Sequence, residues 1–211
     1  IAAEKLPIGR RLTRGMGTGG EISLGRKAVD EERDLIRKNL DGVDLVFLLA
    51  GLGGGTGGGG APAEVNDQQY ENQKHLYKPE EGVYLAPRAP TNTWNLWHQG
   101  HIDPLFDRLI ENLIVFEDVD PDRVYLMGYS AGGDGVYQVA PRMADRLAAA
   151  AMMAGHPNDS TPHSLRNIGF TIHMGGRDSA YNRNKVAASW GQQLDALRKA
   201  DPKGYPHLVK I

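Results

Sequence analysis

Residues 123–147 read RVYLMGYSAGGDGVYQVAPRMADRL. The segment opens with an apolar run, 123–128, that is typical of a buried strand, and it turns into a helix over 130–147. Further apolar runs occupy 44–51, 82–88, 148–155, 168–176 and 207–211, and helical patterns occupy 26–40, 104–118 and 184–200. Strands that alternate with helices form parallel β-α-β units. The sequence therefore predicts a single α/β domain over 1–211, a three-layer αβα sandwich with a mainly parallel sheet.

The composition is that of an ordinary globular protein, with 211 residues, 40% hydrophobic and 24% charged. The formal net charge of −2, without a basic block, gives no support to nucleic-acid binding. The longest apolar runs are too short to cross a bilayer. The absence of cysteine excludes disulfides, thiolate metal sites and a cysteine nucleophile. We expect no metal, no cofactor, no membrane contact and a cytoplasmic location, with the oligomeric state left open. Because the chain begins with isoleucine, we also expect a fragment or a processed chain.

The pentapeptide GYSAG, residues 128–132, fits the pattern G-x-S-x-G. It follows an apolar strand and opens a helix, which is the setting of a nucleophile elbow, where a sharp turn exposes the serine at the carboxyl end of a sheet. This context predicts Ser130 as a nucleophile. The alternative is an ordinary strand-to-helix turn with an inert serine.

A serine nucleophile needs a base, and the base needs an orienting acid. Asp178 follows the apolar run 168–176, where an acid loop is expected, although it would also suit a turn that caps the next helix. Asp134 is a rival acid on the helix after the serine. A histidine is expected after the last strand, but His207 precedes that strand. The other histidines weighed as the base lie elsewhere: His98, His101, His156, His163 and His173.

The stretch AGLGGGTGGGGAPAEV, residues 50–65, is a glycine-rich loop after an apolar run. Bare backbone N–H groups there suit an anion, either a phosphate or the oxyanion of an ester under attack. For an oxyanion hole we predict donors from Ala131, Gly58 and Gly59, with the loop 51–60 beside Ser130. The alternative phosphate site would use Gly53, Gly54, Gly55, Thr56 and Gly57. The Pro-, Asn- and Trp-rich loop 89–104 predicts a substrate rim of Trp94, Trp97 and His98.

Residues 1–57 resemble the FtsZ branch of the tubulin-like GTPases. The segment that carries the resemblance is LTRGMGTGGEISLGRKAVDEERDLIRKNLDGVDLVFLLAGLGGGTG, residues 12–57, which matches that family's phosphate-contacting loop, following helix and strand, and glycine signature. The resemblance implies contact with GTP phosphates. The family's guanine-contacting residues and its acidic loop for GTP hydrolysis have no counterpart here, so the resemblance implies weak GTP binding at best.

Residues 57–211 resemble α/β-hydrolase esterases akin to polyhydroxybutyrate depolymerases. The stretches that carry this second resemblance include VYLAPRAPTNTWNLWHQGHIDPLF, RVYLMGYSAGGDGVYQ and GGRDSAYNRNKVAASW. The resemblance implies an α/β-hydrolase-like, Rossmann-like fold, a small ester or acyl substrate, Ser130 as nucleophile and Asp178 as acid. It places the catalytic histidine just past Ile211.

The two resemblances meet in the glycine loop, so the chain looks like a chimera of an FtsZ-like β-α-β segment, 1–57, and a hydrolase-like segment, 58–211. We expect the strand at 44–51 to replace the hydrolase's own early strand, and the helix at 26–40 to cover one face of the sheet. The predicted function is a carboxylesterase-like serine hydrolase with weak or no activity unless a histidine base is supplied. The alternatives are a GTP-binding fragment of an FtsZ-like cell-division protein and an inactive chimeric scaffold.

Overall fold

A computed structural model describes the backbone of residues 46–49 and, with side chains, residues 67, 70, 71, 83–88, 92, 93, 95 and 97–211. Three sequence predictions lie outside these residues. They are the helix at 26–40, the glycine loop with residues 53–59, and the position of Trp94.

Six parallel strands form one sheet in the order β2-β1-β3-β4-β5-β6. The strands are β1 (Val46–Leu49), β2 (Val83–Leu85), β3 (Val124–Tyr129), β4 (Ala149–Met153), β5 (Gly169–His173) and β6 (His207–Lys210). Each lies within or next to a predicted apolar run, so the predicted parallel sheet is confirmed. The strand β1, from the FtsZ-like segment, pairs on one side with β2 and on the other with β3. Strands from both resembling segments therefore share one sheet, whereas a single domain over 1–211 stays a prediction.

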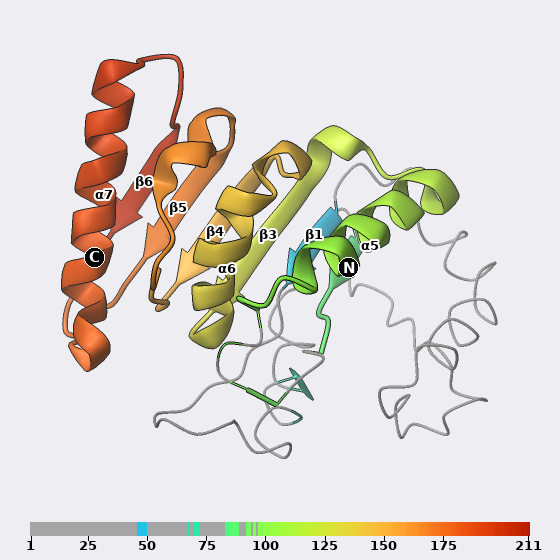
Figure 1. The fold of residues 1–211 in the computed structure, drawn as a ribbon, viewed down its shortest axis with the longest axis horizontal. Helices are drawn as coiled ribbons and strands as arrows, with labels where there is room; N and C mark the ends of the chain where they lie inside the picture. Colours follow the sequence, from blue (N-terminus) through green and yellow to red (C-terminus); the bar gives the residue numbers. More distant parts are fainter. Residues whose placement is uncertain are drawn as a thin grey trace, which may run out of the picture.

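The three long helices that the structure describes cover the same face of the sheet (Figure 1). They are α5 (Ile102–Glu117), α6 (Ala131–Arg142) and α7 (Arg183–Ala200). Short 3-10 turns complete the connections: η1 (Pro121–Arg123), η2 (Ala144–Arg146), η3 (Pro162–Asn167) and η4 (Ala180–Asn182). The helix predicted to reach 147 ends earlier, at Arg142. Pro141, in its last turn, has no N–H to donate to the helix ladder.

The core lies between the sheet and these helices. Tyr137 of α6 contacts Trp190 of α7 edge to face, with ring centroids 4.5 Å apart, and Phe170 of β5 lies 5.4 Å from Trp190. All three side chains are buried. Burying each aromatic ring contributes about 1.5–3 kcal/mol, so this cluster fixes α6 and α7 against the centre of the sheet.

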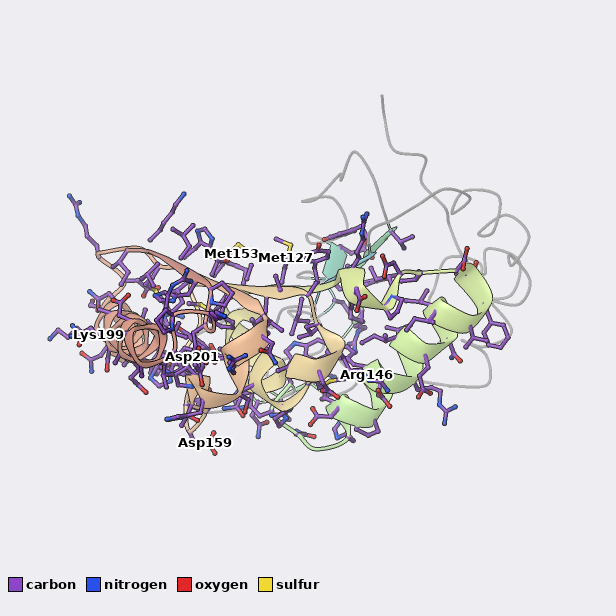
Figure 2. The ribbon with its side chains drawn as sticks, turned by 90° about the horizontal axis from the view of Figure 1, so that it is seen from above. Met127, Arg146, Met153, Asp159, Lys199 and Asp201 are labelled. Carbon is purple, nitrogen blue, oxygen red and sulfur yellow. The ribbon has the colours of Figure 1, made fainter. Side chains whose placement is uncertain are left out.

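The strands alternate between buried and half-buried positions, as expected for two different faces. Met127 and Met153 point away from the three helices (Figure 2). On the helix side, Leu126 and Met152 are almost fully buried. The alternation sets the register of the central strands, because a slip of one residue would turn the buried side chains to the other face.

Candidate active site

Ser130 occupies a strained turn between β3 and α6. Its backbone angles are φ 57° and ψ −123°, a left-handed conformation that an L-residue rarely adopts. The Ser130 N–H donates to the Met153 carbonyl at 2.9 Å, and the Ser130 carbonyl accepts from the Asp134 N–H at 3.0 Å. Backbone strain of this kind costs on the order of 1–3 kcal/mol and persists where the surrounding structure imposes it, often at functional sites.

Glycines let the surrounding backbone close in on this turn. A Cβ added to Gly133 would lie 2.5 Å from the Met153 carbonyl oxygen. One added to Gly155 would lie 2.3 Å from the carbonyl carbon of Gly133. The start of α6 therefore packs directly on the backbone that follows β4, and side chains at these two positions would push the serine turn out of place.

The turn also lies where the chain changes direction across the sheet. After β1 the next strand, β2, is added on one side, whereas after β3 the next strand, β4, is added on the other side. In open parallel sheets, ligands bind at the carboxyl ends of the strands at such a switch point. Ser130 directly follows β3 at this place.

Asp178 lies at the same edge of the sheet, in the turn after β5. The N–H of Asp178 donates to the Gly175 carbonyl at 2.8 Å, and the Asp178 carbonyl accepts from the Asn184 N–H at 3.1 Å. Its carboxylate does not cap the next helix but pairs with Arg183, a residue that sequence reasoning missed. Because β3 and β5 are separated by one strand, their axes lie about 10 Å apart, a span that an imidazole between the two side chains would suit.

Arg183 contacts Asp178 through one carboxylate oxygen only. Its Nη2 and Nε donate to Oδ1 at 3.0 and 3.2 Å, and both side chains are about one-fifth exposed. Its Nη1 donates to the Ala154 carbonyl, after β4, at 3.3 Å. Among the residues that the structure describes, no donor reaches Oδ2 of Asp178, so that oxygen is open to another hydrogen bond.

Asp134, the rival acid, lies one helical turn after Ser130. Its Oδ1 accepts the His156 N–H at 2.7 Å, which attaches the loop after β4 to α6. Burial raises the pKa of the Asp134 carboxyl, and the His156 N–H and the Arg183 charge act against that rise. The Asp134 carboxyl is half-buried and one of its oxygens already accepts a hydrogen bond, so its role is to hold the loop after β4 against α6.

Of the histidines that the structure describes, none hydrogen-bonds to Ser130 or Asp178. The Nδ1 of His156 accepts the Asn158 N–H at 3.0 Å, which leaves the proton of the neutral ring on Nε2. His207, at the amino end of β6, lies with Nε2 3.0 Å from Asp195 and Nδ1 2.8 Å from the Tyr205 carbonyl. Within the residues that the structure describes, therefore, no histidine is hydrogen-bonded to Ser130 as its base.

The predicted oxyanion donors and substrate rim are only partly described. Ala131 is the first residue of α6, where backbone N–H groups have no partner within the helix, whereas Gly58 and Gly59 lie outside the described residues. The prediction that Trp97 lines an exposed rim is wrong. Its side chain is fully buried and stacks on Phe106, with ring centroids 5.6 Å apart.

His98, the third predicted rim residue, is half-buried. Its Nε2 is buried and has no hydrogen-bond partner among the residues that the structure describes. Burial and the Arg142 charge lower the pKa of the His98 imidazole, and the Asp159 charge opposes them. Both of these charged groups are linked to α6. Arg142 is the last residue of that helix, and Asp159 accepts a hydrogen bond from Gln138 of the same helix at 2.9 Å.

The described residues contain no group of three or more His, Cys, Asp or Glu side chains placed to hold a metal ion. None of the described helices is both long and apolar enough to cross a membrane.

The elbow, the parallel sheet and the flanking helices define an α/β-hydrolase-like fold. Residues 75–202 match the model of the dienelactone hydrolase family, which covers more than half of the chain. The chain belongs to the dienelactone hydrolase family. Residues 1–77 match the model of the Tubulin/FtsZ family GTPase domain. The two-part resemblance predicted from the sequence is confirmed.

A curated relative supports the N-terminal match. The chain is 42% identical over 93 residues to the cell division protein FtsZ of Coxiella burnetii (strain RSA 493 / Nine Mile phase I). The match covers 37% of this chain and 24% of that protein, so this chain spans about a quarter of the length of that relative.

Two solved structures share the fold. A thermostable esterase superposes with a TM-score of 0.54 at 18% identity, covering 80% of this chain and 46% of that one. The fluorophosphonate-binding serine hydrolase FphF of Staphylococcus aureus, solved with substrate bound, superposes with a TM-score of 0.50 at 15% identity. That match covers 80% of this chain and 74% of that one. At these identities the likeness concerns the fold alone.

Proposed function

We propose that this chain is a carboxylesterase-like serine hydrolase with weak activity, in which Ser130 attacks small ester or acyl substrates and Asp178 is the acid. The observation that carries the proposal is the left-handed backbone of Ser130 at the elbow between β3 and α6. An inert serine gives no reason to retain this strain, whereas a nucleophile needs the exposure that the turn provides.

In the proposed reaction the Ser130 Oγ attacks the carbonyl carbon of the ester, and its proton passes to a base. The carbonyl oxygen becomes an oxyanion near the start of α6, where the Ala131 N–H and the positive end of the helix dipole stabilise negative charge. The intermediate then expels the alcohol and leaves an acyl group on Ser130, which water removes. Because no described histidine hydrogen-bonds to Ser130, we expect a rate lower by about 10³-fold or more than with a complete triad.

Covalent labelling with a fluorophosphonate probe tests this proposal. The chain should be labelled at one position, identified as Ser130 by mass spectrometry, and Ser130→Ala should abolish the label. Labelling and hydrolysis of p-nitrophenyl acetate should both accelerate when imidazole supplies a base. Labelling elsewhere, or none at high imidazole, would contradict a nucleophilic Ser130.

A second candidate function, GTP binding by the N-terminal segment, is favoured by the match of residues 1–77 to the Tubulin/FtsZ GTPase domain. The glycine signature with Thr56 is the proposed phosphate contact. GTP would then raise the melting temperature, and Thr56→Ala would reduce the shift. An inactive chimeric scaffold predicts neither labelling nor a GTP effect. The cytoplasmic location stays a prediction.

A further inference from the structure

Arg183 lies where three loops of the candidate site meet. It begins α7, donates to the acid Asp178 after β5, and donates to the Ala154 carbonyl after β4. It is also close enough to Asp134 of α6 to interact with its charge. One cationic side chain therefore connects the helix that follows Ser130 with the loop that carries the predicted acid.

The backbone on both sides of these contacts is held in uncommon conformations. Ala154 has φ 50°, and Tyr181 and Asn182, just before the arginine, have φ 52° and 55°. The segments that follow three adjacent strands, β3, β4 and β5, thus contain left-handed residues that are not glycine, counting Ser130 after β3. Such conformations persist where surrounding contacts impose them, and Arg183 donates here to both the Asp178 carboxylate and the Ala154 carbonyl.

The geometry of the pair leaves one oxygen of the acid open. Two donors of Arg183 converge on Oδ1 of Asp178, and Oδ2 accepts no hydrogen bond within the described part of the chain. A guanidinium bound to both oxygens would compete with a base for the carboxylate. Bound to Oδ1 alone, it fixes the rotation of the carboxylate and leaves Oδ2 to accept an imidazole N–H.

From this arrangement, and resting on the proposed function, we infer that Arg183 is a positioning residue that holds Oδ1 of Asp178 so that Oδ2 orients the imidazole base for Ser130. Its role is exercised through Asp178, and it touches neither the substrate nor the reacting atoms. The inference adds a fourth residue to the proposed machinery.

The test uses imidazole as the base and follows two signals in the full chain. The first is the rate of Ser130 labelling by a fluorophosphonate across an imidazole titration. The second is the ¹³C signal of the Asp178 side-chain carboxyl, which reports imidazole binding without any reaction. The variants are Arg183→Gln, Arg183→Lys and Asp178→Asn. The matched control is Arg177→Gln, which removes a charge from an exposed residue next to Asp178.

We expect both signals to saturate with imidazole in the unaltered chain. Arg183→Gln should raise the half-saturating concentration about tenfold, because the two charge-assisted hydrogen bonds that orient the carboxylate through Oδ1 are lost. Arg183→Lys, which retains a donor, should restore part of the difference, Asp178→Asn should remove saturation, and Arg177→Gln should match the unaltered chain.

Two results would overturn the inference: a carboxyl signal that does not respond to imidazole in the unaltered chain, or an identical response in Arg183→Gln. If Arg183→Gln does not fold, the comparison of Arg183→Lys with Arg177→Gln decides the matter, because a shift in the lysine variant alone is expected. An absent Ser130 label with a normal carboxyl response would reject the proposed function and leave the role of Arg183 supported.

Discussion

The α carbon of Gly128 lies against the carbonyl group of Gly132. These two glycines flank the turn of residues 129–131, which carries Ser130. A Cβ added to Gly128 would lie 2.1 Å from the Gly132 carbonyl oxygen and 2.9 Å from a methyl carbon of Val136. Gly128 of the G-x-S-x-G pattern therefore serves the backbone, because the absence of a side chain there allows β3 and the first turn of α6 to touch around Ser130.

Replacing Gly128 by alanine should destabilise the fold strongly. The added methyl would meet backbone atoms that cannot move aside, so the free energy of unfolding should fall by about 3 kcal/mol or more. Gly100→Ala is the matched control, because a Cβ there meets no atom within 4 Å. Urea denaturation of both variants measures the difference, and equal midpoints would show that the turn relaxes without cost.

Removing the hydroxyl of Tyr137 should leave stability unchanged or improve it. The oxygen is buried and finds no hydrogen-bond partner in the described part of the chain. Burial raises the pKa of this phenol, and the Asp134 charge adds to the rise. Tyr137→Phe should raise the free energy of unfolding by about 1 kcal/mol. Tyr137→Ala should lower it by about 3–5 kcal/mol, because the ring packs on Trp190. A destabilised phenylalanine variant in thermal unfolding would argue against an unpaired hydroxyl.

The charge of the Asp134 carboxylate and its hydrogen bond to the His156 N–H have separate effects on stability, which two variants can distinguish. Since burial raises the pKa of the carboxyl in the folded chain above its ordinary value of 3.8, the folded state favours the protonated form. The contribution of Asp134 to stability therefore falls as pH rises from that value through the folded pKa.

At pH 7, Asp134→Asn should match or exceed the unaltered chain in stability, because the amide oxygen still accepts the His156 N–H. Asp134→Ala leaves that N–H without its acceptor and should lose about 1–3 kcal/mol. Denaturant titrations at pH 4 and pH 7 check both, and the advantage of the asparagine variant over the unaltered chain should be greater at pH 7.

His98 should make the fold sensitive to mild acid. Burial, followed by the Arg142 charge, lowers the pKa of the imidazole below its ordinary value of 6.5, against an opposing effect of Asp159. The folded chain therefore favours neutral His98, and stability falls as pH drops from 6.5 through the folded pKa. His98→Gln should reduce the stability difference between pH 7.5 and pH 5. The measurement is the melting temperature across this range, and an unchanged slope in the variant would exclude His98 as its source.

Residue patterns gave reliable predictions where burial itself determines the structure. The apolar runs mark each of the six strands that the structure describes, because strands buried in a parallel sheet need continuous apolar sequence. The end of α6 was placed too late because the apolar periodicity continues past Pro141, although the backbone ladder does not. Periodicity describes the face that a helix presents, and not where its hydrogen bonds stop.

The surroundings of the site were harder to predict, since they depend on contacts between distant segments. Trp97 lies in a loop whose composition suggests a rim, yet its indole is buried because Gly135 of α6 has no side chain; a Cβ there would lie 2.7 Å from the Trp97 Cβ. The segment between Asp178 and Arg183, which pair with each other, contains left-handed Tyr181, a conformation that its residue type does not signal.

Ser130 itself provides the last prediction, because its strain and its proposed chemistry should be separable. At φ 57° and ψ −123°, the Cβ of an L-residue is disfavoured, whereas glycine adopts such angles readily. Ser130→Gly should therefore raise the free energy of unfolding by about 1 kcal/mol relative to Ser130→Ala, which keeps the Cβ. Neither variant has the hydroxyl, so both should lose fluorophosphonate labelling, and only stability should distinguish them.

Glycine also increases the freedom of the unfolded chain, which acts in the opposite direction, so a more stable glycine variant would be direct evidence of strain at the serine. A glycine variant less stable than the alanine variant in urea denaturation would show that the turn holds Ser130 without significant strain, and would remove the principal support for a nucleophilic role.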